Sequence, residues 1–272
     1  MPQAAGLVHK GVPLSGSTIE ALDQEYSRGL GSYVLKEAGL KPSEVDKLQE
    51  IPWKDYILIA NRAAQKYNQE NPRPGMMRGG FAPVADGVNL PKGKFFADPE
   101  GLSSGVPMMI NTTFHEWSAS RTNPELENIT LDKVIENVKN RSGFSGGFGD
   151  KAAEVVNAYA KAFPDKKPVE IWSMVSSSRQ GVVTLADAKS KQAAPVYVAW
   201  FCWQPPLFDN RARAAHCVDI CFWYYNTDLM LSHTGGGAKP LEHQRVSIIG
   251  RCTFSLPILV CNFSYFSLVN PS

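Results

Sequence analysis

A continuous apolar run, Val106-Pro107-Met108-Met109-Ile110, ends at the polar residues Asn111-Thr112-Thr113. Because the run lacks the alternation of a half-exposed strand, it is typical of a strand that is buried on both faces of a sheet. A second run of this kind, PVYVAWFCW at residues 195–203, is dense in β-branched and aromatic side chains. The two runs predict two buried strands.

Amphipathic helical patterns alternate with these strands. Apolar residues recur at three- and four-residue spacing within longer stretches, which are residues 18–40, 53–67, 131–138 and 152–163. A further short strand is expected at residues 7–14, closed by the turn Ser15-Gly16-Ser17. Buried strands that alternate with helices predict an α/β fold with a mostly parallel sheet.

The composition is that of a globular protein. Of the 272 residues, 43% are hydrophobic, and 28 Lys and Arg against 26 Asp and Glu give a formal net charge of +2. A balance so close to zero creates no strong field, so neither nucleic acid nor an anionic membrane is expected as a partner. The five cysteines all follow residue 200, and an odd number cannot pair completely within one chain, so no disulfide framework is expected.

The two ends of the chain bear on targeting and membrane insertion. Residues 1–10, MPQAAGLVHK, lack the basic region and apolar core of a signal peptide, and the compartment is left without a prediction. Residues 253–269, TFSLPILVCNFSYFSLV, are apolar, but Pro257, Asn262 and three serines interrupt them. A spanning helix needs about 20 mainly apolar residues, so this stretch is expected to form one or two strands rather than a membrane span.

Two polar residues stand just beyond the predicted buried strands. Glu116 follows the first strand, and His216 lies on the loop after the second. Functional groups in open α/β sheets gather beyond the carboxyl ends of neighbouring parallel strands, so this carboxylate and imidazole could meet there. Such a pair suits general-base chemistry, because the carboxylate fixes the imidazole tautomer and stabilises the imidazolium. From spacing alone a second interpretation stays open, in which Glu116 is a solvated loop acid and His216 a packing residue.

The sequence contains no strong cofactor or metal motif. No G-x-G-x-x-G follows a predicted strand, and no Walker-type lysine motif occurs. His216 with Cys217 and Cys221 offers a single C-x3-C spacing, which is a weak zinc signal, whereas buried neutral cysteines are common. We therefore expect neither a bound cofactor nor a metal.

Several blocks of the chain stand in a fixed order. They are LVHKGVPLSGS (7–17), FAPVADGVNLP (81–91), GVPMMINTTFHEW (105–117), APVYVAWFCWQPP (194–206), RAAHCVDICFWYYNTD (213–228) and HTGGGA (233–238). In this order they resemble the type-B carboxylesterases, which include the para-nitrobenzyl esterases and, more distantly, the cholinesterases. The resemblance covers about residues 1–238 and implies the carboxyl-terminal half of an α/β-hydrolase domain, so the α/β-hydrolase fold is expected to be incomplete. Residues 239–272 depart from the family as a divergent apolar tail.

The family hydrolyses carboxylic esters with a serine, histidine and glutamate triad, and the resemblance assigns two of these residues. The acid of the family's G-T-x-x-x-E motif corresponds to Glu116, and the triad histidine corresponds to His216. The chain has Asn111 where the family usually has glycine and Cys221 where a proline is common. Neither change removes a chemical group of the triad.

The third member, the nucleophile, is given no counterpart in this chain. The family carries it in G-E-S-A-G-G, on a turn between a strand and a helix, and this hexapeptide is absent from the sequence. Serines near a glycine are not expected to join a strand to a helix as a nucleophile elbow does; they are Ser15, Ser17, Ser103 and Ser104. The resemblance therefore implies an acid and a base whose nucleophile and oxyanion-hole glycines are expected upstream of Met1.

The resemblance implies a hydrolase that acts on small-molecule carboxylic esters without a cofactor. Because a triad works as a unit, the isolated chain is expected to be inactive, and a complementing N-terminal half is its expected partner. The alternative is a non-catalytic, cholinesterase-like binding or adhesion module, or a remnant of an enzyme. Retention of both Glu116 and His216 favours the enzyme, since a binding module needs neither.

Overall fold

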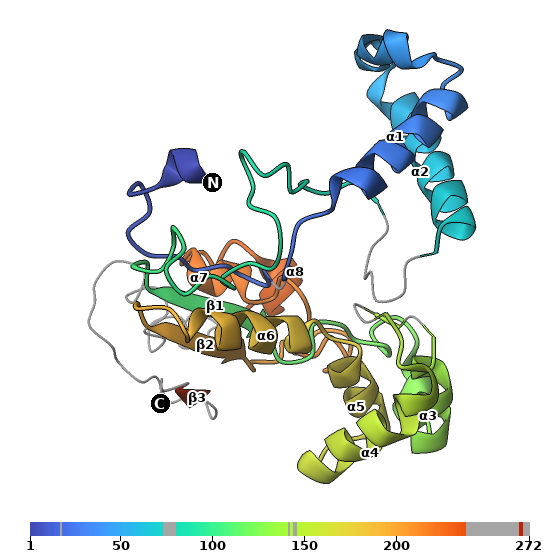
Figure 1. Ribbon diagram of the computed structural model, residues 1–272. Coiled ribbons are helices and arrows are strands. Elements are labelled where there is room, and N and C mark those ends of the chain that lie inside the picture. The colour runs from blue at the N-terminus through green and yellow to red at the C-terminus, as the bar shows by residue number, and fades with distance from the viewer. Residues whose placement is uncertain (17, 73–79, 141, 144–145, 238–266, 269–272) are drawn as a thin grey trace. The chain divides into compact units, whose positions relative to one another are not determined.

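The computed structural model describes residues 1–16, 18–72, 80–140, 142–143, 146–237 and 267–268 (Figure 1). The chain divides into two compact units. The first comprises Met1–Ala5 and Glu20–Phe95, and the second comprises Gly6–Ile19 and Phe96–Ser272. The residues of the candidate site all belong to the second unit.

The first unit is built on two packed helices, α1 (Gln24–Glu37) and α2 (Trp53–Glu70), with a 3₁₀ segment at Pro42–Glu50 between them in the chain. The side chain of Asp23 caps α1 by accepting a backbone N–H of its first turn at 2.7 Å. The sequence predicted a helix from residue 18, but Glu20 and Leu22 form β-bridges, so the helix begins only at its cap.

The second unit is organised around two parallel strands, β1 (Met108–Thr113) and β2 (Val196–Phe201). They pair in register along their whole length, from Met108 opposite Val196 to Thr113 opposite Phe201. The last four residues of β1 are buried, whereas β2 keeps several half-buried positions. Both predicted strands and their parallel orientation are confirmed.

A third segment pairs with β1 on its other side. Residues 11–14 bridge to β1 in parallel through Gly11 and Leu14. The strand predicted over residues 7–14 is therefore realised only in its second half. Pro13 has no backbone N–H to donate, which limits the pairing to isolated bridges.

Beyond residue 237 the structure describes only β3 (Ser267–Leu268), which runs antiparallel to β2. β3 falls within residues 253–269, for which one or two strands are predicted, and the rest of that stretch lies outside the described residues. The predicted boundary between residues 1–238 and the tail at 239–272 falls there too and stays a prediction. In the described residues no helix combines the length and the apolar character that a membrane span requires.

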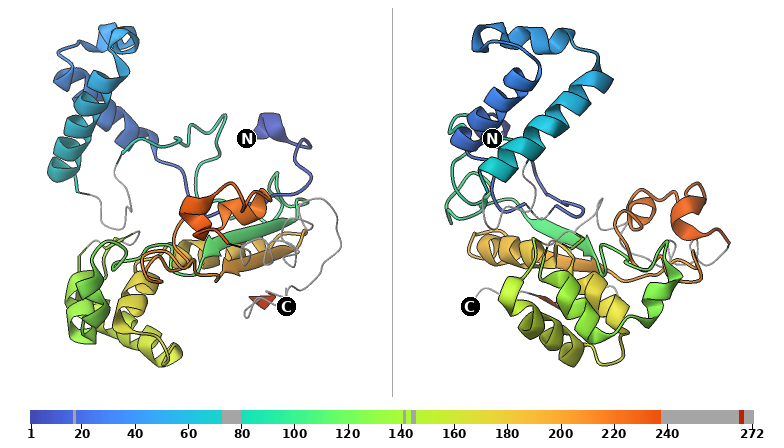
Figure 2. Two further views of the ribbon diagram at one scale, coloured as in Figure 1. Left: turned by 180° about the vertical axis from the view of Figure 1, so that it is seen from behind. Right: turned by 90° about the vertical axis from the view of Figure 1, so that its right-hand side faces the viewer.

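Helices flank the strands of the second unit. α6 (Arg179–Lys189) packs along β1 and β2 (Figure 2). Three further helices pack on one another, and they are α3 (Leu131–Val138), α4 (Ala152–Ala162) and α5 (Pro168–Val175). Two single-turn helices, α7 (Ile220–Trp223) and α8 (Leu231–Thr234), follow β2 in the chain. Shorter 3₁₀ segments occur at Pro2–Ala4, Pro124–Asn128 and Gly149–Lys151.

The sequence predicted α3 and α4 but neither α5 nor α6. Most residues of α5 are buried, so its sequence lacks the polar face whose period would reveal a helix. α6 begins directly after three serines, residues 176–178, and serine side chains favour turns and caps over helix interiors. Of the two missed helices, α6 packs on β1 and β2, and α5 contributes Met174 to the buried cluster that includes Phe114 and Ala214.

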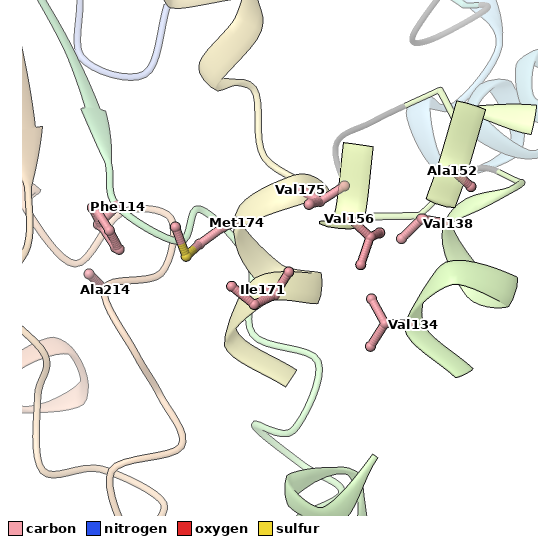
Figure 3. Close-up of a cluster of buried hydrophobic side chains, with 9 residues drawn as sticks. All are labelled: Phe114, Val134, Val138, Ala152, Val156, Ile171, Met174, Val175 and Ala214. Atoms are coloured by element: carbon pink, nitrogen blue, oxygen red, sulfur yellow. The ribbon is translucent and has the colours of Figure 1, made fainter. Parts of the chain in front are cut away.

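A cluster of buried apolar side chains connects the helices to the segments that follow the two strands (Figure 3). Its members are Phe114, Val134, Val138, Ala152, Val156, Ile171, Met174, Val175 and Ala214. In Figure 3, Met174 of α5 extends the cluster toward Phe114, which follows β1, and Ala214, which follows β2. The helical core therefore supports both segments that carry the predicted site residues.

Replacing Ile171 by alanine tests how much this core contributes to the free energy of unfolding. Ile171 is almost wholly buried, so Ile171→Ala should lower the free energy of unfolding by about 2–5 kcal/mol through lost burial and a residual cavity. Val183→Ala, at an exposed position of α6, is the matched control and should change it by less than about 0.5 kcal/mol. Urea denaturation of the three proteins measures both values. Equal effects at the two positions would contradict the assigned core.

Candidate functional site

The parallel pairing of β1 and β2 continues into the loops that follow them. The N–H groups of His115 and Glu116 both donate to the carbonyl of Ala214, at 3.1 and 3.3 Å. The N–H of His216 in turn donates to the carbonyl of Glu116 at 2.8 Å. Main-chain hydrogen bonds therefore hold the acid and the histidine in a fixed register, before either side chain is considered.

Glu116 occupies an unusual backbone conformation. Its φ is +57°, in the left-handed region that side-chain-bearing residues seldom adopt, and the residue is only 2% exposed. The hydroxyl of Thr113 accepts the Glu116 N–H at 3.1 Å, which supports the turn locally. A buried acid held in a strained conformation is a recurrent feature of functional sites.

The Glu116 carboxylate accepts hydrogen bonds on both oxygens. Oε2 lies 2.7 Å from Nδ1 of His216. Oε1 accepts from the Thr112 hydroxyl at 2.5 Å, the Thr113 N–H at 2.8 Å and the Ser15 hydroxyl at 3.1 Å. The carboxylate is thus fixed by donors from three separate segments of the chain.

These donors decide the charge of the acid. Burial raises the pKa of Glu116, but the hydrogen bonds from His216, Thr112 and Thr113 outweigh burial and hold the pKa below its ordinary value. An ionised carboxylate at 2.7 Å keeps a proton on Nδ1 of His216, so Nε2 becomes the basic nitrogen of the ring. The side chain of His216 is 44% exposed, against 1% for Glu116. The pair has the chemistry of a general base with a buried anionic anchor.

The structure brings together the two residues that the sequence singled out. The interpretation of Glu116 as a solvated loop acid is wrong, because the carboxylate is buried and fully hydrogen-bonded. The catalytic roles of Glu116 and His216 stay predictions. Ser15 is a further site residue, which the sequence analysis weighed only as a nucleophile. It follows the segment that bridges to β1, at a φ of +54°, and its hydroxyl donates to the acid.

Two stretches meet the bare spacing G-x-S-x-G, which the sequence analysis did not weigh: Gly101–Gly105 and Gly143–Gly147. The first lies at the amino ends of the strands, because the carbonyl of Ser104 accepts the N–H of Ala194 just before β2 begins. That is the opposite end from the acid and the histidine. The serine of the second stretch, Ser145, lies outside the described residues, as does Ser17.

The two departures from the family pattern are both accommodated in buried positions. Asn111 donates through Nδ2 to Asp219 Oδ2 at 2.6 Å, and the same oxygen accepts the indole N–H of Trp223 at 2.9 Å. This contact ties β1 to the chain three residues beyond His216. Cys221 is buried, its thiol donates to a backbone carbonyl at 3.5 Å, and burial raises its pKa to about 11.

A metal site finds no support among the residues with described positions. Within residues 1–16, 18–72, 80–140, 142–143 and 146–237, no three His, Cys, Asp or Glu side chains are grouped as metal ligands. The thiol of Cys217, beside His216, has its pKa raised by burial and by nearby carboxylates. Among the described residues around His216, the hydrogen-bonded Glu116–His216 pair is the arrangement best suited to proton transfer.

Comparison with known proteins finds a partial similarity to esterases. No family model matches the chain. The para-nitrobenzyl esterase of Bacillus subtilis (strain 168) is 28% identical over 236 residues, which cover 84% of this chain and 43% of that esterase. The chain is related to the carboxylesterases. It spans less than half the length of this relative.

Solved esterase structures share the fold. An esterase from Clostridium hathewayi, described as hydrolysing aliphatic aromatic polyesters, matches with a TM-score of 0.56 and 26% identity over 84% of this chain and 43% of that one. A thermophilic para-nitrobenzyl esterase matches with a TM-score of 0.60 and 21% identity, over 92% of this chain and 48% of that one. A carboxylesterase of Geobacillus stearothermophilus matches with a TM-score of 0.53 and 20% identity, over 90% of this chain and 46% of that one. The expected α/β-hydrolase fold, represented in part, is confirmed.

Thr112→Val tests how the carboxylate is held. Valine keeps the shape but loses the hydroxyl donor, so the pKa of Glu116 should rise. Because the folded-state pKa lies below the unfolded value, ionised Glu116 contributes stability above the unfolded pKa that is lost as the pH falls through the folded one. Thr112→Val should therefore destabilise the chain by about 1.5–3 kcal/mol at neutral pH and by less at about pH 3.

Urea denaturation at both pH values measures the difference, with Thr112→Ser as the matched control. Serine retains a hydroxyl and should preserve most of the stability and its pH dependence. A Thr112→Val destabilisation that is the same at neutral and acid pH would contradict the assigned charge of Glu116.

Proposed function

We propose that this chain carries the acid–base part of a serine ester hydrolase centre. The observation that supports the proposal most strongly is the 2.7 Å contact between Glu116 Oε2 and His216 Nδ1, beyond the carboxyl ends of two parallel strands. The relation to carboxylesterases supports the same reaction class.

In the proposed reaction, His216 removes the proton of a serine hydroxyl as the oxygen attacks the ester carbonyl. Nε2 takes the proton, and the imidazolium is stabilised by the ionised Glu116 at Nδ1. The proton passes to the leaving alcohol, and an acyl-serine forms. Water then attacks the acyl group, with His216 again acting as base, and the carboxylic acid and free serine are released.

In this proposal the serine comes from a segment outside these 272 residues, carrying the family's G-E-S-A-G-G. The segment Gly11–Leu14 supports it, because among the described residues it pairs on one side only, with β1, and leaves an edge for a further strand. The chain alone would then lack the nucleophile and be inactive. A complementing N-terminal half is the proposed partner.

The proposed substrates are small-molecule carboxylic esters, and no cofactor enters the reaction. The support comes from the relatives, one of which is a para-nitrobenzyl esterase and another an esterase of aliphatic aromatic polyesters. The site residues themselves, one carboxylate and one imidazole, suit proton transfer and require no bound group.

Two substitutions test the function in a complex of this chain with a segment that carries G-E-S-A-G-G. Glu116→Gln and His216→Gln should each lower kcat for a para-nitrobenzyl ester by about 10⁴-fold, with little change in KM, because both residues act on the transferred proton. Stopped assays of product release measure the rates. Glu136→Gln, at an exposed position on α3, is the control and should keep the parent rate. Parental kcat in either site variant would reject the proposal.

A further inference from the structure

A second histidine–carboxylate pair lies directly behind the first. His115, the residue before Glu116, is completely buried, and its Nε2 lies 3.6 Å from Oε1 of Glu170 on α5. Its other nitrogen, Nδ1, accepts the N–H of Ala214 at 3.3 Å. Because Nδ1 is an acceptor, the ring proton stands on Nε2 and faces the Glu170 carboxylate. The imidazole is therefore hydrogen-bonded to the loop that leads to His216, and its Nε2 lies near Glu170 of α5 beyond hydrogen-bond distance.

His115 closes a ring of hydrogen bonds with a single residue. Its backbone N–H donates to the Ala214 carbonyl at 3.1 Å, while its Nδ1 accepts the Ala214 N–H. Ala214 is completely buried and stands two residues before His216. Without Nδ1 its N–H would lose its acceptor in a place that water does not reach. The side chain of His115 thus supplies the hydrogen-bond acceptor for the Ala214 N–H, on the loop that leads to His216.

Burial is the main influence on the protonation of His115. Burial lowers the pKa of His115, and the cations Lys166 and Arg213 lower it further, while Glu170 opposes them. A neutral ring with its proton on Nε2 can accept the Ala214 N–H at Nδ1.

Glu170 is itself strongly anchored. Although burial raises its pKa, contacts from His115, the Lys167 N–H and Lys166 hold the pKa to about 2. Lys166 Nζ lies 3.1 Å from Oε1, and Arg213 Nη1 lies 4.0 Å from the same oxygen. Arg213 is held by both oxygens of Glu127, at 2.7 and 2.9 Å. The Glu170 carboxylate thus lies near His115, which precedes Glu116, and near Arg213, which lies on the loop that leads to His216.

We propose that His115 is a positioning residue, which locks the loop bearing His216 to the turn bearing Glu116 so that His216 Nδ1 stays within hydrogen-bond reach of the carboxylate. The inference deepens the proposed function, since the aligned pair is the proposed proton carrier. It follows from geometry alone: the acceptor at Nδ1, the main-chain donor of the same residue and the carboxylate behind Nε2 all act on one loop.

Two amide substitutions separate this role from general support of the fold. In His115→Asn the side-chain oxygen stands near the place of Nδ1 and can accept the Ala214 N–H. In His115→Gln the amide reaches toward Glu170 instead and leaves Ala214 without its acceptor. The two variants carry the same amide group and differ by one methylene. They therefore differ chiefly in whether the side chain contacts the Ala214 N–H or Glu170.

The readouts are amide hydrogen exchange at Ala214 and the low-field proton resonance of the His216 Nδ1–H, both recorded on the full chain. His115→Gln should speed exchange at Ala214 by about tenfold or more and remove the low-field resonance. His115→Asn should keep both near the parent values. Val134→Ala, a core variant on α3, should lower the melting temperature and keep the resonance.

The proposal is overturned if His115→Gln keeps the resonance with parental exchange at Ala214. It is equally overturned if His115→Asn behaves as His115→Gln does or fails to fold, or if Val134→Ala loses the resonance too. Neither readout requires ester turnover. An inactive complex with an intact Asn-against-Gln difference would reject the proposed function and leave the positioning role standing.

Discussion

The parallel register of β1 against β2 is the constraint on which the site depends. Because the strands run in the same direction, the chain leaves both of them at the same edge of the sheet, and the following loops meet there. The pairing then continues past the strands, with Glu116 opposite Ala215. A slip of one residue would turn each side chain to the opposite face and separate the carboxylate from the imidazole.

The site combines a buried carboxylate, Glu116, with a partly exposed imidazole, His216. Glu116 is buried, yet it stays ionised because four donors face its two oxygens. Glu170, which is buried, and Arg213, which is half-buried, form a second set of charges whose partners come from other segments. Charges of this kind are costly when unpaired, so each pair favours one arrangement of the loops over all others. These ion pairs and hydrogen bonds thereby fix the positions of the loops more narrowly than apolar packing alone would.

The sequence predicted the parts of the fold that have a clear period or composition. The runs at residues 106–110 and 195–203 are apolar throughout, and they form the two parallel strands. Glu116 and His216 were singled out because each follows one of these strands, and the family resemblance pointed to the same residues. The structure then placed their side chains in contact.

Other features had no signal that local pattern could carry. α5 is buried on most sides, so no polar face marks it. The contacts of Ser15 with Glu116 and of His115 with Ala214 join residues about a hundred positions apart, and only the strand register brings them together. A local motif can also be present without the site that it indicates. The spacing G-x-S-x-G occurs at residues 101–105, but it lies at the amino ends of the strands, opposite the end that carries Glu116 and His216.

The most direct test of the account is the proton NMR spectrum of the 272-residue chain with ¹⁵N-labelled histidine. If Glu116 and His216 are joined as described, a low-field resonance from the His216 Nδ1–H should be present in the parent and absent from Glu116→Gln. A parent spectrum without that resonance, or one that Glu116→Gln leaves unchanged, would contradict the contact on which the esterase interpretation depends.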